Sequence, residues 1–206
     1  EFEWQPAPEA VSSVEGYTPI GYNFFRKGPQ IFYSITTYEL DEDNVEQVSD
    51  VVYIPIYGAD VETFEVFEGH AQYAKDKNSV YMRIQPAWSS ESDHKVVRIE
   101  KADPQTFEVK IVEEFPVSQG NTYRSWISRD VNHVYYQDQI IDGADPASFM
   151  LTDHVSLNFD INNVYLWYKI LPDADPSTYE VVIDTSAAGR GVVFGKDADN
   201  CYKDYE

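Results

Sequence analysis

The sequence contains little cysteine and no long hydrophobic run. Cys201 is the single cysteine among 206 residues, so an intrachain disulfide is excluded. No run approaches the roughly 18 apolar residues of a transmembrane helix, and we expect no membrane span. Methionine is also scarce, with 2 residues against 16 tyrosines, 11 phenylalanines and 4 tryptophans. This aromatic-rich composition favours β structure over a helical bundle.

Basic residues are few compared with acidic residues. The chain has 15 Lys and Arg against 36 Asp and Glu, which gives a net charge of −21 at pH 7. Such a charge argues against nucleic acid or an anionic membrane surface as a partner. It is compatible with a basic protein partner, with cation binding, or with solubility alone.

The motifs of common enzyme classes are missing. The four histidines form no His-Glu-x-x-His pair, and the sequence has no Gly-x-Ser-x-Gly segment. The Gly-Arg-Gly turn at 189–191 is not followed by the Lys-Ser/Thr of a phosphate loop. Carboxylates are so abundant that pairs at glycosidase spacing are expected by chance. We therefore expect no enzymatic activity and name no catalytic residue.

A two-part motif occurs twice in the second half of the chain. Its first part, Asp-x-Asn-x-Val-Tyr, occupies 130–135 and 160–165, and its second part, Ala-Asp-Pro-x-Ser/Thr-aromatic, occupies 144–149 and 174–179. The two copies start 30 residues apart (160 − 130), and in both copies 15 residues separate the two aspartates (145 − 130 and 175 − 160). A fixed period of this size indicates a repeat protein.

Further copies extend the pattern in both directions. The first part recurs at 76–81, and the second part recurs at 102–107 and, in a related form, at 59–64. A degenerate first part lies at 25–33, and residues 197–202 open a last copy. We predict an extended leader at 1–17 and a β-repeat domain at 18–206, with repeats at about 22–67, 73–110, 126–151 and 157–183 and a partial repeat at 194–206.

These residues resemble the bacterial DKNYY repeat family. The resemblance rests on Asp76-Lys77-Asn78 followed by an aromatic residue, and on the later Ala-Asp-Pro-x-Thr-Phe-Glu-Val at 102–109. It covers roughly 22–205, and the degenerate segment 25–33 departs from it most. The resemblance implies an often exported repeat protein without a known enzymatic activity, and it carries over no catalytic residues.

The residue types of each part predict a local structure. Asp-x-Asn is turn chemistry, because Asp and Asn side chains bond to nearby backbone groups, and the β-formers at 126–128 and 134–136 predict a hairpin around it. Ala-Asp-Pro predicts a capping Asp with Pro at the first helical position. We expect one helical or 3₁₀ turn there, whose Phe or Tyr enters the core before Glu-Val begins another strand.

A repeat of about 30 residues cannot bury its own apolar face, so neighbouring repeats must stack. We predict a mainly β fold of stacked antiparallel β-hairpin repeats with short helical turns, forming an elongated or propeller-like array. Cys201 occupies the repeat position of Val80, Val134 and Val164. We therefore expect it to be a small buried hydrophobic residue.

Two acidic insertions are the best candidates for a partner surface. One lies between Tyr33 and Tyr53, and the other follows Tyr81. Insertions in repeat proteins tend to emerge on one face, which often binds a partner, although they are otherwise variable decoration. The candidate partner-binding residues are Asp41, Glu42, Asp43, Trp88, Glu91 and Asp93.

We expect no cofactor, with calcium as the one metal alternative. The acidic segments 41–44 and 197–200 offer alternating oxygen ligands of the kind that calcium uses. Neither continues into the Gly and Glu of an EF-hand loop. Turn formation explains the Asp-x-Asn segments without a metal.

These observations favour a non-enzymatic protein-binding module. The most concrete hypothesis is an immunity protein that neutralises a secreted antibacterial toxin, because an acidic surface would cover a basic cleft. The alternative is an exported cell-envelope structural or adhesion repeat protein, with calcium stiffening its turns. The Pro-containing leader and the resemblance favour a periplasmic or otherwise exported location over a cytoplasmic one.

Overall fold

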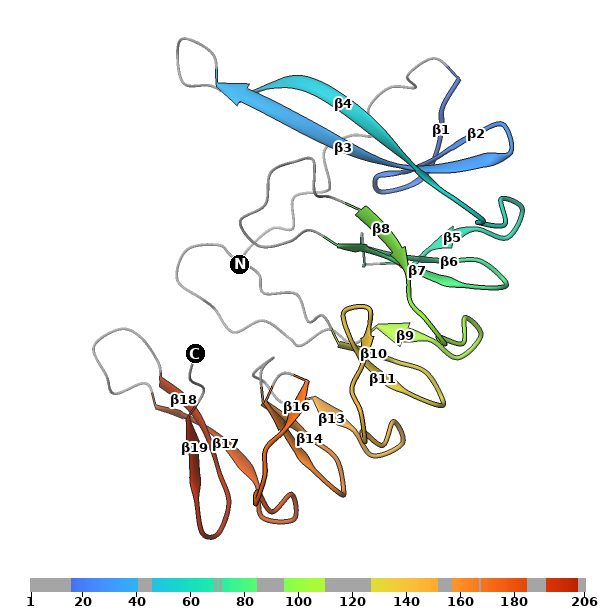
Figure 1. The fold of residues 1–206 in the computed structure, drawn as a ribbon. Helices are drawn as coiled ribbons and strands as arrows, with labels where there is room; N and C mark the ends of the chain where they lie inside the picture. Colours follow the sequence, from blue (N-terminus) through green and yellow to red (C-terminus); the bar gives the residue numbers. More distant parts are fainter. Residues whose placement is uncertain are drawn as a thin grey trace. The chain divides into compact units, whose positions relative to one another are not determined.

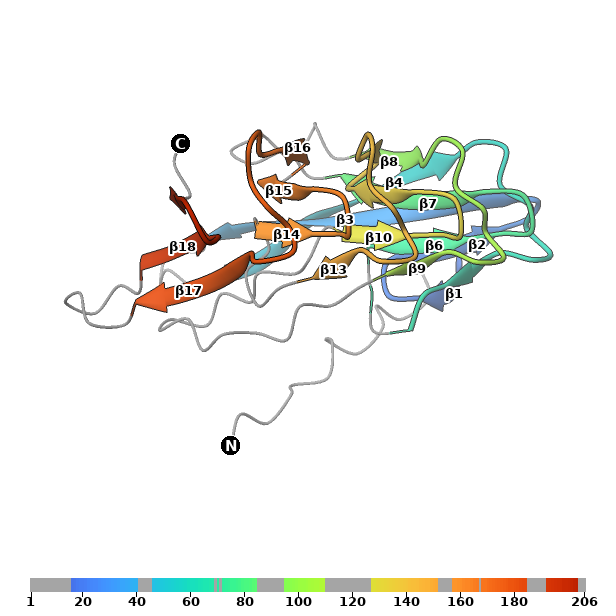
Figure 2. The same cartoon turned by 90° about the horizontal axis from the view of Figure 1, so that it is seen from below.

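The protein is a β protein in the part that its computed structural model describes. This part comprises residues 16–40, 46–68, 70, 72–84, 95–109, 127–151, 157–166, 168–184 and 192–203. Figures 1 and 2 show small antiparallel sheets and no helix among these residues. The predicted mainly β class is confirmed. The chain forms two compact units, residues 1–105 and 106–206, which we describe separately.

The N-terminal unit holds two four-stranded antiparallel sheets. The first sheet contains, in spatial order, β1 (Thr18–Gly21), β2 (Phe24–Lys27), β3 (Gln30–Leu40) and β4 (Glu46–Ile56). The second contains β5 (Glu65–Val66), β6 (Tyr73–Lys75), β7 (Val80–Ile84) and β8 (Lys95–Arg98). The degenerate segment at 25–33 therefore forms most of the β2–β3 hairpin, and β3 and β4 take up much of the first predicted insertion.

The C-terminal unit holds three smaller antiparallel sheets. The first contains β9 (Glu108–Val109), β10 (Ile127–Arg129), β11 (Val134–Tyr136) and β12 (Gln139–Ile140). The second contains β13 (Met150–Leu151), β14 (Leu157–Phe159), β15 (Val164–Leu166) and β16 (Lys169–Ile170). The third contains β17 (Glu180–Asp184), β18 (Val192–Lys196) and β19 (Cys201–Lys203).

Each of these small sheets contains a hairpin around an Asp-x-Asn turn or, in β18–β19, around the related turn Asp197-Ala198-Asp199-Asn200. In β10–β11 Arg129 lies opposite Val134, and in β14–β15 Phe159 lies opposite Val164, so the predicted hairpins are confirmed. The short strand that follows an Ala-Asp-Pro turn pairs with the next hairpin along the chain, as β13 pairs with β14. A sheet thus combines the end of one predicted repeat with the start of the next.

The core of the C-terminal unit lies between neighbouring sheets. Ile127, Val134 and Ile141 belong to the first sheet and its end, and they pack with Phe149 and Tyr165 of the second. The corresponding cluster of the N-terminal unit joins Phe24, Ile31, Tyr33, Ile35, Ile56, Phe64, Ala74 and Tyr81. A single small sheet buries too little apolar surface to be stable alone, so packing of sheet on sheet supplies the core.

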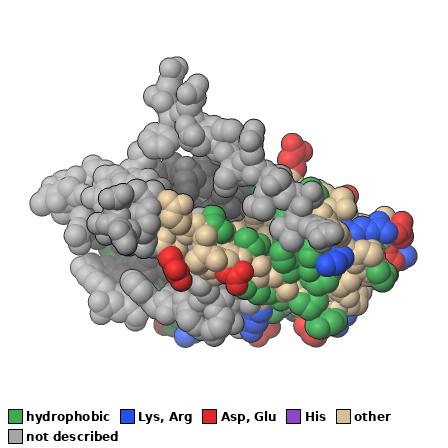
Figure 3. Space-filling view, turned by 90° about the horizontal axis from the view of Figure 1, so that it is seen from above, with side chains coloured by type: hydrophobic (Ala, Val, Ile, Leu, Met, Phe, Trp, Pro, Cys, Tyr) green, Lys and Arg blue, Asp and Glu red, His purple; other side chains and the backbone are tan. Residues whose placement is uncertain are grey.

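The first sheet of the N-terminal unit is apolar on its second face as well. Successive side chains of a strand point to opposite faces, so Phe25 and Phe32 lie away from the core residues Phe24 and Tyr33. On that second face the ring of Tyr17 stacks on Tyr53, with 4.0 Å between the ring centroids. Figure 3 shows hydrophobic side chains grouped on the described part of one face of the molecule.

The predicted short helical turns are not present among the described residues. The segment after Ala144 forms a single hydrogen-bonded turn, in which the N–H groups of Ser148 and Phe149 donate to the Asp145 carbonyl. The next residue, Met150, already pairs with Phe159 of β14, so strand pairing ends the turn before a helix can form. The capping part of the prediction is confirmed, because the Asp145 carboxylate accepts the Ala147 N–H at 3.1 Å.

Cys201 is exposed, which corrects the prediction of a buried residue. At the same repeat position Val134 is fully buried, because the following sheet covers it with Tyr165. No described sheet follows β19. The burial of this position therefore depends on the neighbouring sheet and not on the hairpin itself.

Tyr179 and Gly195 are matched in size. Tyr179 is the aromatic residue after the last Ala-Asp-Pro, where the other three copies have Phe64, Phe107 and Phe149. A Cβ atom added to Gly195 would lie 1.9 Å from the Tyr179 Oη atom. The same Cβ would lie 2.4 Å from the Cζ atom of Tyr179, so the ring and its hydroxyl fit only because the facing residue has no side chain.

We predict that Gly195→Ala lowers the free energy of unfolding by about 1–3 kcal/mol, because the added methyl group overlaps Tyr179 in a packed region. Gly21→Ala is the matched control, since its added Cβ would meet Val66 at an ordinary 3.6 Å. Urea unfolding measures both variants. Equal stability of the two variants would show that the Tyr179–Gly195 contact is not tight.

Candidate functional site

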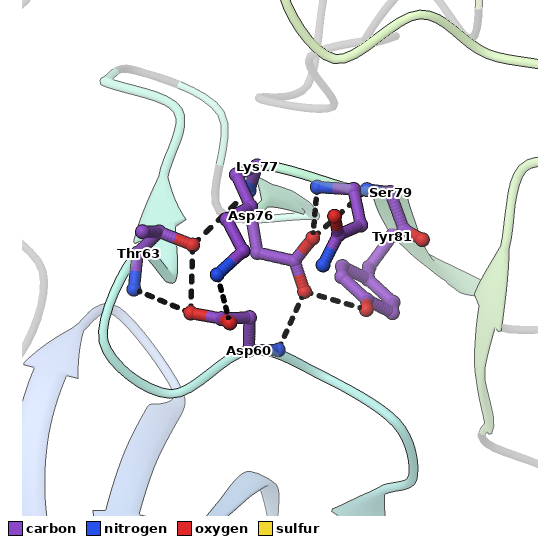
Figure 4. A network of polar contacts seen from close by, with 7 residues as sticks. Asp60, Thr63, Asp76, Lys77, Ser79 and Tyr81 are labelled. Carbon is purple, nitrogen blue, oxygen red and sulfur yellow. Dashed lines mark hydrogen bonds and ion pairs between the residues drawn. The ribbon is translucent and has the colours of Figure 1, made fainter.

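A buried carboxylate organises each Asp-x-Asn turn. In the N-terminal unit Asp76 is 3% exposed, and its Oδ1 atom accepts the N–H groups of Asn78 at 2.7 Å and Ser79 at 2.8 Å. Its Oδ2 atom accepts the Tyr81 hydroxyl at 2.9 Å and the Asp60 N–H at 2.7 Å (Figure 4). The first two bonds confirm the predicted turn chemistry. The last one joins this turn to the preceding Ala-Asp segment.

A second layer of hydrogen bonds closes the contact between these two turns. The Asp60 carboxylate accepts both the N–H and the hydroxyl of Thr63, at 3.1 and 2.9 Å. The Thr63 hydroxyl oxygen in turn accepts the N–H of Lys77 at 3.1 Å. The Lys77 ammonium lies 2.7 Å from Asp60 Oδ2, as Figure 4 shows. Lys77, the central residue of the hairpin turn, is thereby held to the preceding turn through both its backbone and its side chain.

The same arrangement recurs in the C-terminal unit. The Asp160 carboxylate accepts N–H groups of Asn162 and Asn163, the Tyr165 hydroxyl and the Asp145 N–H, all at 2.7–2.8 Å. Asp197 repeats the pattern with Asp199, Asn200, Tyr202 and Asp175 at 2.7–3.0 Å. Asp130 accepts N–H groups of Asn132 and His133 and the Tyr135 hydroxyl.

The side-chain pKa values follow from these contacts. Burial, together with the hydrogen bond to Asp76, raises the pKa of Tyr81 to about 12. Hydrogen bonds from Asp175 and Tyr202 hold the pKa of Asp197 well below its usual range. Bonds from Ser148 and Ala147 lower the pKa of Asp145 in the same way. Asp145 and Asp197 are therefore charged and Tyr81 is neutral at neutral pH.

These turns form an acidic edge on the C-terminal unit, which we name the tip edge. It comprises the turn segments 130–133, 142–148, 160–163, 172–178 and 197–200, which Figure 1 shows along one border of the three sheets. The segments contain neither Lys nor Arg. They contain eight aspartates, namely Asp130, Asp142, Asp145, Asp160, Asp173, Asp175, Asp197 and Asp199.

Two exposed apolar side chains lie within the tip edge. Val131 is 65% exposed and Ile161 is 71% exposed, and each is the central residue of an Asp-x-Asn turn. Their N–H groups donate to the hydroxyls of Thr106 and Ser148, at 3.2 and 3.3 Å. The corresponding residue of the N-terminal unit is the charged Lys77. Val131 and Ile161 occupy the variable position of the Asp-x-Asn motif, and the available signal for the edge was an apolar side chain between two turn-forming polar residues.

The six predicted partner-binding residues lie outside the described part of the chain. Asp41, Glu42 and Asp43 fall between the ends of β3 and β4. Trp88, Glu91 and Asp93 fall between β7 and β8. Their assignment as a partner surface stays a prediction.

The acidic segment 197–200, a predicted calcium alternative, uses its first carboxylate for the turn. Both oxygen atoms of Asp197 accept hydrogen bonds from the protein. Among the described residues, no group of three or more His, Cys, Asp or Glu side chains is placed to hold a metal ion. Within the same residues, nothing helical has the length and hydrophobicity of a membrane span.

Comparison with known proteins identifies the part of the chain that contains the tip edge. Residues 126–206 match the model of the DKNYY family. This region belongs to the DKNYY family. The family assignment expected from the repeated motifs is thus confirmed over residues 126–206, which include the hairpins β10–β11, β14–β15 and β18–β19. No curated protein and no solved structure matched the chain.

In this DKNYY region the repeated residues have structural explanations. The Asp carboxylate, the Asn N–H and the Tyr hydroxyl of the motif meet in one network, as Asp160, Asn162 and Tyr165 do. Sequence analysis missed the role of the tyrosine hydroxyl and the link to the preceding turn. The regular spacing of Tyr five residues after Asp (135 − 130 and 165 − 160) was the available signal.

We predict that Asp160→Asn lowers the free energy of unfolding by about 2–4 kcal/mol. The amide NH₂ of the variant would face the N–H of Asp145 and the hydroxyl of Tyr165, leaving buried donors without an acceptor. Asp142→Asn, an exposed position on the same edge, is the matched control and should change stability by less than about 0.5 kcal/mol. Urea unfolding distinguishes them, and equal effects would contradict the role of Asp160.

We also predict a loss of stability in acid. The pKa values of Asp60, Asp145, Asp175 and Asp197 are lowered in the folded protein, so the unfolded chain binds more protons. Their contribution is present above the unfolded pKa of about 3.9 and is lost as the pH falls through the folded values. The melting temperature should therefore decrease below about pH 4.

Thermal unfolding between neutral and acidic pH, in about 0.3 M salt to screen the net charge, measures this decrease. The Asp197→Asn variant should melt at a lower temperature at neutral pH and lose less on acidification than the wild type. A wild-type melting temperature that stays constant down to about pH 2.5 would contradict the assignment.

Proposed function

We propose that this chain is a non-enzymatic binding protein that presents an acidic surface to a basic protein. In its most concrete form it is an immunity protein, which occludes the active site of a secreted antibacterial toxin. The observation that carries the proposal is the distribution of charge. The net charge is −21, and the tip edge has eight aspartates without a Lys or Arg among them.

The physical basis is electrostatic complementarity. A surface of one sign accelerates association with a partner of the opposite sign and disfavours wrong partners. Hydrogen bonds lower the pKa of Asp145 and Asp175, so these carboxylates stay charged to a lower pH than a free aspartate does. The DKNYY match of residues 126–206 is compatible with a binding role and names no activity.

The proposal includes the arrangement and the location expected from the sequence. We propose that the hairpin repeats stack into an elongated or propeller-like array, with the acidic insertions of the N-terminal unit as the partner surface. We further propose that the protein is periplasmic or otherwise exported, as the resemblance to the DKNYY repeat family implies. Within each unit, the packing of neighbouring sheets supports the stacking.

A charge-reversal experiment tests the proposed function. The chain is used as bait with an extract of the native organism, and bound protein is eluted with a salt gradient. We expect a basic protein that is released at moderate salt. The triple variant Asp41→Lys, Glu42→Lys, Asp43→Lys should slow its association by about tenfold or more at low salt.

The matched control carries the same change of charge at exposed acids of the N-terminal unit, namely Asp50→Lys, Glu68→Lys and Glu100→Lys. An association rate that falls equally in both variants would show a diffuse charge effect and overturn the surface assignment. Recovery of envelope glycans alone would favour a structural or adhesion module instead.

A further inference from the structure

The tip edge combines exposed apolar side chains with a rigid backbone. Val131 and Ile161 expose 65% and 71% of their surface although both are β-branched residues in turns. Turns usually carry polar residues or glycine at such positions. The N–H of each residue is held by a hydroxyl of the preceding turn, and the flanking Asp is buried. The two side chains are therefore presented in fixed positions.

Two carboxylates of the tip edge, Asp145 beside Ile161 and Asp175 beside Ala198, form no ion pair within the described part of the chain. Asp145 accepts hydrogen bonds from Ser148 and Ala147 of its own turn, and Asp175 accepts them from Ser177 and Thr178. In the N-terminal unit the equivalent Asp60 also pairs with Lys77 at 2.7 Å. Ile161 occupies the position of Lys77 opposite Asp145, and Ala198 occupies it opposite Asp175, so the edge of the C-terminal unit lacks this cation.

We propose that the tip edge is a docking surface for a basic segment of a partner protein. The segment places apolar side chains on Val131 and Ile161, and Lys or Arg side chains beside Asp145 and Asp175, where they supply the cation that Lys77 provides internally. This inference rests on the proposed function, because it assigns the chemistry of the same basic partner. The proposed function places the contact on the acidic insertions of the N-terminal unit, whereas this inference places a contact on the tip edge of the C-terminal unit.

Charge and spacing define the segment further. A second copy of the chain carries the same net charge of −21 and would be repelled, so the occupant is a basic chain. Packed sheets lie about 10 Å apart, and three residues of a polyproline II chain complete one turn and span about 9 Å, so every third side chain lies on the same face. A segment with Lys and an apolar residue recurring about every three positions matches the neighbouring turns.

The test uses the full chain and two labelled synthetic peptides. The probe peptide repeats Lys-Leu-Ser, and the comparison peptide repeats Lys-Ser-Ser, so both carry the same charge. We expect the probe peptide to bind the wild-type chain at least about tenfold more tightly than the comparison peptide. A tenfold change in affinity corresponds to about 1.4 kcal/mol, and burial of one Leu side chain contributes more than this. The double variant Val131→Ser, Ile161→Ser should abolish this difference.

Tyr57→Ser is the matched control, since Tyr57 is an 82% exposed apolar residue of the N-terminal unit. It should leave the preference for the probe peptide unchanged. The variant Asp145→Asn, Asp175→Asn retains oxygen acceptors for the turns and should weaken both peptides by about the same factor. Circular dichroism and urea unfolding confirm that each variant is folded.

Three results would overturn the docking surface. The two peptides bind equally well, or the Val131→Ser, Ile161→Ser variant keeps the preference, or the wild type self-associates through these residues in sedimentation experiments. The peptide assay involves no toxin. A negative peptide result would therefore contradict only the assignment of the tip edge as a docking surface. A negative result in the Asp41–Asp43 charge reversal would contradict the proposed insertion surface and would not affect the peptide result.

Discussion

A carboxylate that accepts four hydrogen bonds holds two turns of the chain together, and the small sheets depend on it. Asp76 and Asp160 each accept two N–H groups of their own turn, one tyrosine hydroxyl and one N–H of the preceding turn. A buried carboxylate is costly unless it is fully hydrogen-bonded. Hairpin, tyrosine and preceding turn must therefore be in place together, which makes the contact cooperative.

The local turns could be predicted from the sequence, whereas the contacts between them could not. Asp130 and Asp145 are 15 residues apart, and so are Asp145 and Asp160, so spacing alone does not say which neighbour an Ala-Asp-Pro turn contacts. The structure links Asp145 to Asp160. Two-residue strands such as β12 carry too few residues for a periodic pattern, and the expected helical turns fail because strand pairing resumes at once.

The candidate site, like the contacts between turns, could be predicted only in part from the sequence. Sequence analysis selected acidic insertions because charge and length are visible in a sequence, but exposure is not. Val131 and Ile161 are conventional strand-forming residues in the sequence, and only their position at the tips makes them exposed. The network of Asp130 and Asp160 thus has two consequences, since it stabilises the sheets and also presents an apolar and acidic edge with a fixed geometry.

Hydrogen exchange of individual amides, followed by NMR, tests the central role of the buried carboxylates most directly. The N–H groups of Asn162 and Asn163 lie in an exposed turn, yet they donate to Asp160. We predict that these amides, and the Asp145 N–H, exchange as slowly as the amides of β14 and β15. Exchange of these three amides at the rate of an unstructured peptide would contradict it.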